Sequence, residues 1–206
     1  MAFDYSWLIG GPQGSGVDTA ANIFSRVGTK LGYHVFGKRE YHSNIKGLHS
    51  YFVVRLSDNK IRSIVNGANI MVAFDAETMI RHGLSISKNG AIIYDSSIVN
   101  TSIDEIPTIE VDHRIRLDEF FKSKNMEPKV SSIIELAKKS GVNVYPISFW
   151  DALSNIADEL KRPELSRMTR MFNVLGVSFS LGVLKAPIAP LPVSYTHLTL
   201  PTICSV

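Results

Sequence analysis

A glycine-rich turn near the start of the chain is the first segment whose residue types suggest binding chemistry. The apolar residues 7–9 lead into Gly-Gly-Pro-Gln-Gly-Ser-Gly at 10–16, and apolar residues then recur at helical spacing. Backbone N–H groups at a helix N-terminus, free of side-chain bulk, can hold a phosphate or a carboxylate. We therefore predict a strand, a turn and a helix, with Gly11, Gly14 and Gly16 shaping the wall of a binding site.

The turn departs from two well-known phosphate-binding motifs. Gly11 and Gly16 have the separation of a Walker loop, but Val17 and Asp18 stand where that loop requires Lys and Ser or Thr. A dinucleotide fingerprint fits poorly as well, because the carboxylate of Asp18 would repel a pyrophosphate. An alternative stays open, in which the glycines only form a tight connection between strand and helix.

A second candidate is the polar segment 38–50, which follows a short predicted strand at 34–37. Ligands of α/β sheets bind preferentially beyond the carboxyl ends of the strands. The cations of the segment could meet an anion, and its other donors could add hydrogen bonds. The cations are Lys38, Arg39 and Lys46, and the donors are His42, Ser43 and Asn44. An ordinary solvated loop would have a similar composition, so this alternative also stays open.

Metal binding and nucleophilic catalysis find no support in the residue spacing. His42 and His49 are the only histidines close together, and the single cysteine is Cys204. There is no Gly-x-Ser-x-Gly motif, so we assign no catalytic residue and no metal ligand. Four acidic residues near an expected strand are assigned to the surface: Asp104, Glu105, Glu110 and Asp112.

Composition predicts one domain without nucleic-acid or membrane partners. A chain of 206 residues that is 45% hydrophobic can bury an adequate core. The net charge of +3 is spread along the chain and provides no cationic face for a phosphate backbone. No secretory signal opens the sequence, so we expect a cytoplasmic location. With one cysteine, the chain cannot hold a disulfide framework or an iron–sulfur cluster.

Strands alternate with helices along the chain, which predicts an α/β, Rossmann-like three-layer domain with a mostly parallel sheet. The expected strands are 7–9, 34–37, 49–56, 70–74, 91–94 and 142–147, and the expected helices are 17–31, 77–82, 130–137, 150–160 and 165–184. The last helix is apolar but too short and interrupted for a membrane span. Small residues in it should let another element approach closely: Gly176, Ser178, Ser180 and Gly182.

The character of the sequence changes after residue 186. Prolines stiffen a predicted linker at 187–192, and residues 193–206 resemble a translated sequencing adapter. We therefore take 1–186 as the domain, exclude 193–206 as a non-native tail, and expect a truncated chain.

Two segments resemble a known family. Residues 9–24 and 36–51 closely resemble the opening of the archaeal-type alpha subunit of 2-oxoacid:ferredoxin oxidoreductases, in which the gamma domain is fused at the N-terminus. The resemblance continues more loosely through 165–184. It implies that 1–186 is a gamma-type domain, also described as the catalytic domain of pyruvate/ketoisovalerate oxidoreductases.

The resemblance implies an enzyme that oxidatively decarboxylates a 2-oxoacid, such as pyruvate or 2-oxoglutarate, to an acyl-CoA. Thiamine diphosphate, Mg²⁺ and an iron–sulfur cluster would belong to the complete heterodimeric complex with a beta subunit, and ferredoxin would accept the electrons. This fragment would bind none of these cofactors alone and would not be active alone. The gamma domain would line the coenzyme A and substrate side of the cavity. The implied binding residues are Lys46, Asn44, Ser43, Arg39, Gly11, Gly14 and Gly16.

Two other function classes remain open. A free-standing Rossmann-type enzyme would bind NAD or NADP, with Glu40 holding the ribose hydroxyls or Arg39 a 2′-phosphate. A non-catalytic assembly module would use the final helix and the glycine turn only to dock other subunits.

Overall fold

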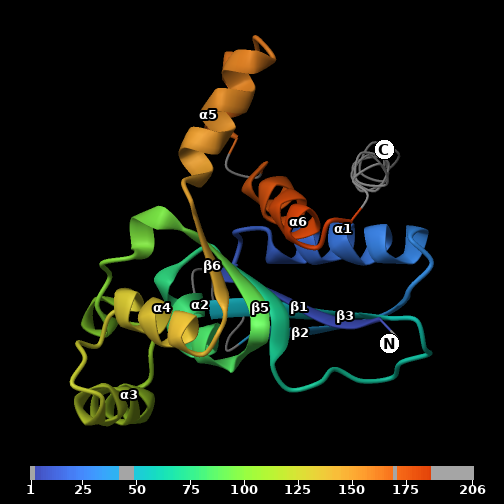
Figure 1. Ribbon diagram of the computed structural model, residues 1–206. Coiled ribbons are helices and arrows are strands. Elements are labelled where there is room, and N and C mark those ends of the chain that lie inside the picture. The colour runs from blue at the N-terminus through green and yellow to red at the C-terminus, as the bar shows by residue number, and fades with distance from the viewer. Residues whose placement is uncertain (1–2, 42–48, 169–170, 187–206) are drawn as a thin grey trace, which may run out of the picture.

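The computed structural model describes residues 3–41, 49–168 and 171–186 and shows a six-stranded sheet with helices on both faces (Figure 1). The strands are β1 Asp4–Pro12, β2 His34–Tyr41, β3 His49–Ser57, β4 Ala68–Ala73, β5 Ile86–Asp95 and β6 Asn143–Ile147. The helices are α1 Val17–Lys30, α2 Ala76–His82, α3 Val111–Ser123, α4 Val130–Lys139, α5 Phe149–Glu159 and α6 Phe172–Val183. Short 3₁₀ turns are η1 Gly83–Ser85, η2 Ser96–Ile98, η3 Ile103–Glu105 and η4 Pro163–Arg167.

The strand order is β2-β3-β1-β4-β5-β6. Strand β3 runs antiparallel to both of its neighbours, whereas β1, β4, β5 and β6 pair in parallel. Strand β2 therefore has the same direction as β1, and β3 alone is reversed. The predicted mostly parallel, three-layer α/β fold is confirmed.

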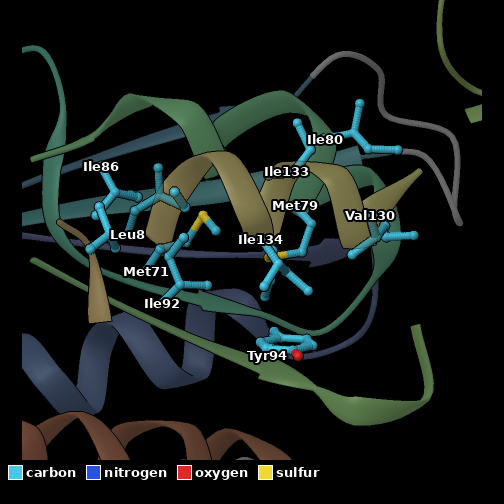
Figure 2. Packing of buried hydrophobic residues seen from close by; sticks show 14 of the residues in the cluster. Leu8, Met71, Met79, Ile80, Ile86, Ile92, Tyr94, Val130, Ile133 and Ile134 are labelled. Atoms are coloured by element: carbon cyan, nitrogen blue, oxygen red, sulfur yellow. The ribbon is translucent and has the colours of Figure 1, made fainter. Parts of the chain in front are cut away.

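Side chains alternate between the two faces of the sheet and build two cores. Trp7 and Ile9 of β1 pack with α1, α5 and α6, whereas Leu8 between them packs with α2 and α4. This is the period of two that a strand covered on both sides requires. Figure 2 shows the second core, where Met79 of α2 and Ile134 of α4 lie among the strand residues.

Helix α6 approaches the sheet closely, as its small residues predict. A Cβ on Gly176 would lie 3.1 Å from Cγ1 of Val72, so a larger residue would push the helix off β4. The buried indole Nε1 of Trp7 donates to the hydroxyl of Ser180 at 2.8 Å. No described residue lies within 4 Å of a Cβ added to Gly182, so the described part of the chain makes no close approach there. Among the described residues, no helix has the length and apolarity to cross a membrane.

Strand β2 is longer than predicted. The sequence suggested an irregular segment from residue 38, but Lys38 pairs with Val53 and Tyr41 with Ser50. The ladder to β3 satisfies the backbone there, and an edge strand tolerates polar side chains. Arg39 consequently lies in a strand and not in a loop.

The region 101–129 was predicted least well. The sequence predicted no element here, whereas the structure has η3 and α3 in this stretch and an isolated bridge that joins Ser102 to Lys129. Helix α3 buries only Phe121, so it has no apolar stripe that could reveal it. The last predicted helix is also interrupted: η4 is a 3₁₀ turn, and α6 begins at Phe172.

Candidate functional site

The glycine turn lies at the point where the sheet changes its winding direction. Strands β1 and β4 are parallel neighbours, with Gly10 paired to Ala73 near their carboxyl ends. Helix α1 leaves β1 toward one face of the sheet, and α2 leaves β4 toward the other (Figure 1). In open α/β sheets, ligands bind in the crevice at such a switch point. The predicted strand, turn and helix are thus confirmed, and the turn has the location expected of a binding site.

Two glycines give the turn its shape. Gly14 and Gly16 have φ values of 97° and 88°, in the left-handed region that favours glycine. Gly16 is the N-cap of α1, and no side chain caps this helix. The first N–H groups of α1 therefore have neither an intrahelical acceptor nor a capping side chain.

A pocket of about 420 Å³ opens at this end of α1. Its lining comes from the turn, from the end of β4 and from α6: Pro12, Gly14, Ser15, Gly16, Thr19, Phe74, Phe172 and Asn173. Asn173 is only 3% exposed. Its amide lies so close to the turn that a Cβ on Gly16 would come within 2.0 Å of Nδ2.

Sequence reasoning did not identify Asn173 as a site residue. Its partners are at the opposite end of the described chain, and periodicity carries no information about such distant contacts. One signal was available, because Asn173 is the only amide in the mostly apolar sequence of α6. A buried amide in such a helix normally has a specific partner.

The strand pairing brings the two predicted loops to the same edge of the sheet. Ser50 of β3 pairs with Gly11 of β1 on one side and with Tyr41 of β2 on the other, and His49 pairs with Pro12. His49 therefore lies directly beside the end of β1, and Tyr41 lies one strand further away at the same edge of the sheet. Three predicted binding residues lie outside the described residues, so their positions stay a prediction: Ser43, Asn44 and Lys46.

Arg39 connects β2 to the glycine turn. Its Nη1 lies 3.1 Å from Oδ2 of Asp18 in the first turn of α1. The repulsion that Asp18 would exert on an anion is thereby reduced, because the guanidinium offsets its charge. Both side chains are more than a third exposed, so the pair contributes little to folding. Nearby, a hydrogen bond from Lys38 to Glu40 raises the pKa of Lys38.

A buried polar cluster lies on the α2 side of the switch point. His49, Asp75 and Glu77 each offer a ligand atom, and these atoms lie within 4.8 Å of one another. The Nε2 atoms of His49 and His82 are 3.0 Å apart, so one ring donates to the other. Spacing along the chain could not reveal this group, because β3 and α2 supply its members.

Protein donors already engage the carboxylates of this cluster. Glu77 accepts from Nε of Arg81 at 2.8 Å and from the hydroxyl of Thr108 at 2.5 Å. Asp75 caps α2 by accepting from both N and Oγ1 of Thr78. These bonds account for both carboxylates as structural groups, and we assign no metal to the cluster.

Asp75 predicts a dependence of stability on pH. Burial raises the pKa of this carboxyl above its ordinary value of 3.8, although hydrogen bonds from Thr78 act in the opposite direction. The folded state then holds the proton more tightly than the unfolded state, so this group lowers stability as pH rises from 3.8 through the raised pKa. Asp75→Asn keeps the capping oxygen and removes the charge, so we expect a flatter profile of unfolding free energy against pH.

Urea unfolding at a series of pH values from about 4 to 7, where a buried carboxyl titrates, measures this profile. Asp75→Ala is the control, because it removes the cap as well as the charge and should be less stable than Asp75→Asn by about 1 kcal/mol at every pH. An unchanged slope in Asp75→Asn would show that Asp75 is not the group responsible.

The match to a family model places the chain among known proteins. The model described as "Pyruvate ferredoxin/flavodoxin oxidoreductase" matches residues 6–194. The chain belongs to this family. The resemblance drawn from the two loop segments is confirmed.

Members of this oxidoreductase family from archaea are similar over most of the chain. Identity is 38% over 179 residues to "2-oxoacid:ferredoxin oxidoreductase 1, subunit alpha" of Sulfurisphaera tokodaii. It is 39% over 180 residues to the "2-oxoacid:ferredoxin oxidoreductase subunit alpha" of Saccharolobus solfataricus. Each match covers 87% of this chain but 28% of the relative, so the chain spans little more than a quarter of these alpha subunits.

Solved structures from the same group of enzymes share the fold. The gamma subunit of a keto/oxoacid ferredoxin oxidoreductase from Geobacter sulfurreducens superposes with a TM-score of 0.59 at 12% identity, covering 94% of this chain and 83% of that one. The 2-oxoglutarate:ferredoxin oxidoreductase from Magnetococcus marinus gives a TM-score of 0.50 at 18% identity, covering 94% of this chain and 30% of that one.

The family assignment and the strand order both argue against the dinucleotide-binding alternative. In a Rossmann fold the acidic residue that binds the ribose ends a strand adjacent to the first one. Here β3 lies between β1 and β2, so Glu40 of β2 is one strand too far away. The free-standing NAD(P) enzyme is therefore not supported.

Proposed function

We propose that this chain is the gamma-type domain of an alpha subunit in a 2-oxoacid:ferredoxin oxidoreductase. The complete enzyme would convert a 2-oxoacid, such as 2-oxoglutarate or pyruvate, to an acyl-CoA and pass electrons to ferredoxin. The names of the archaeal relatives support this proposal, as does the Magnetococcus enzyme, whose structure has 2-oxoglutarate, coenzyme A and succinyl-CoA bound. The domain would comprise 1–186, followed by a linker at 187–192 and a non-native tail at 193–206.

Within that enzyme, the domain would line the coenzyme A and substrate side of the cavity. The observation that supports this proposal is the pairing of Ser50 with both Gly11 and Tyr41, because Tyr41 and His49, which bound segment 42–48, lie at the same edge of the sheet as the glycine turn. Coenzyme A phosphates and 2-oxoacid carboxylates are anions that need fixed cations. Lys46 would be the main cation, with Arg39, Asn44 and Ser43 in support.

The redox and thiamine chemistry would reside in other parts of the complex. Iron–sulfur clusters need several thiolates, and this chain has Cys204 alone. Among the residues that the structure describes, those lining the glycine-turn pocket include no cation for a diphosphate and no carboxylate for Mg²⁺. Thiamine diphosphate would supply the electron sink for decarboxylation, held by the remainder of the alpha subunit and by a beta subunit. This domain would bind and orient the 2-oxoacid and coenzyme A within a cytoplasmic complex.

Lys46→Ala in the complete alpha–beta enzyme tests this assignment. Loss of a charge-assisted hydrogen bond typically costs about 1.5–3 kcal/mol, so we expect the KM for the 2-oxoacid or for coenzyme A to rise by about 10- to 100-fold. Steady-state kinetics with each substrate varied in turn measures the effect. Lys139→Ala is the matched control, because that exposed lysine pairs with Glu135 on α4. Unchanged KM values for both substrates would refute the role of Lys46.

A further inference from the structure

The pocket at the N-terminus of α1 contains polar groups that the fold leaves without partners. The amide oxygen Oδ1 of Asn173 is buried and has no hydrogen-bond partner among the described residues. The hydroxyl of Ser15 is also buried and has no hydrogen-bond partner among the described residues. Both residues line the pocket. Buried polar groups of a native protein are nearly always satisfied, so these two point to a ligand that completes them.

The ligand group that fits is polar and uncharged. None of the described residues that line the pocket carries a charge, and Arg39 offsets the one carboxylate in the first turn of α1, Asp18. An anion could not satisfy Oδ1 of Asn173, because this oxygen is an acceptor and needs a donor. An amide can do both things required: it accepts from the free N–H groups of α1 and donates to Asn173.

The remainder of the lining is apolar. Phe74 and Phe172 contribute rings to the same pocket, and Pro12 adds a third apolar surface. Such walls suit a chain of methylene groups that joins polar units. At about 420 Å³ the pocket can hold part of a small molecule, and its place at the switch point of the sheet favours a small molecule over a protein segment.

We propose that this pocket binds the amide-containing pantetheine arm of coenzyme A, with Asn173 recognising one of its amides. The inference rests on the proposed function, in which coenzyme A enters from this side, and it refines that function. The cationic segment would hold the phosphates, and the neutral pocket would hold the arm that carries the thiol. Gly16 is then required twice, for its left-handed backbone and for the space that the amide of Asn173 occupies.

Binding measurements on the complete alpha–beta enzyme test the proposal. Asn173→Leu keeps the approximate volume and removes the amide. Calorimetric titration would use three probes: coenzyme A, pantetheine, and the adenosine bisphosphate portion alone. We expect Asn173→Leu to raise the Kd for coenzyme A and for pantetheine by a similar factor, about tenfold for one lost hydrogen bond. The Kd for the adenosine bisphosphate should stay unchanged.

Two further variants guard against a general loss of structure. Ser178→Ala is the matched control, because Ser178 is on the same helix, bonds only to the carbonyl of Val174 and does not line the pocket. It should bind all three probes as the unmodified enzyme does. Ser15→Ala removes the second unpartnered group without enlarging any side chain and should weaken pantetheine in the same direction as Asn173→Leu.

The possible outcomes separate this inference from the function on which it rests. Unchanged pantetheine affinity in both Asn173→Leu and Ser15→Ala overturns the inference, as does a loss of affinity confined to the adenosine bisphosphate. Failure of the unmodified enzyme to bind coenzyme A overturns the proposed function itself. If Lys46→Ala has no effect while Asn173→Leu weakens the binding of pantetheine, the proposed role of Lys46 is wrong and the proposed pantetheine site at Asn173 is supported.

Discussion

Gly16→Ala should lower the free energy of unfolding by about 3 kcal/mol, the largest loss expected from adding one methyl group to the glycine turn. Two costs combine at this position. The backbone has a φ of 88°, which an L-residue adopts only with strain. The added Cβ would also lie 2.0 Å from Nδ2 of Asn173, so the buried side chain of Asn173 would have to shift. Urea denaturation with linear extrapolation measures the loss.

Gly14→Ala separates the two costs. Gly14 has a similar φ of 97°, but none of the described residues lies within 4 Å of an added Cβ. We expect this variant to lose only the backbone contribution, about 1 kcal/mol. The double variant Gly16→Ala with Asn173→Ala should recover the steric part and keep the backbone part. Equal losses for Gly14→Ala and Gly16→Ala would mean that the contact with Asn173 does not constrain the turn.

The sequence predicted the elements whose residue pattern is complete within a short window. The apolar run at 91–94 indicated a strand covered on both faces, and β5 contains it. The turn at 10–16 was also readable, since glycines that adopt positive φ follow an apolar run and precede a periodic one. In both cases the local residues carry the information, and tertiary contacts only extend the element by a few residues.

Elements that depend on a distant partner were not predictable in the same way. Lys38 and Arg39 are polar enough for a loop, and only their pairing with β3 makes them a strand. Helix α3 has one buried residue, Phe121, so its sequence lacks the stripe on which a helix prediction depends. The hydrophobic periodicity of a sequence marks elements that bury one face. These segments bury few residues, so they lack such a pattern.

The residues of the candidate site also differ in whether the local sequence could identify them. Its glycines could be named from sequence, because a positive φ at a helix N-cap leaves a local signature. Asn173 and the contact between His49 and His82 could not, because each joins elements far apart in the chain. The polar segment 38–50 was singled out by composition, and the structure adds that Tyr41 and His49 lie at the same edge of the sheet as the glycine turn.

Arg81→Met should destabilise the domain by about 3–5 kcal/mol, because it removes the partner of a buried carboxylate. The side chains of Arg81 and Glu77 are 7% and 6% exposed, and their Nε and Oε1 atoms are 2.8 Å apart. Urea denaturation measures this loss as well.

A second substitution shows whether the unpaired charge of Glu77 causes the loss of stability. Adding Glu77→Gln to Arg81→Met should restore most of the stability, since the neutral amide can still accept from the hydroxyl of Thr108. Lys139→Met provides the exposed comparison, because its pair with Glu135 is more than half exposed and should contribute less than about 1 kcal/mol. If Glu77→Gln restores no stability, the loss in Arg81→Met comes from the lost contacts of the Arg81 side chain. The unpaired charge of Glu77 would then not be the cause.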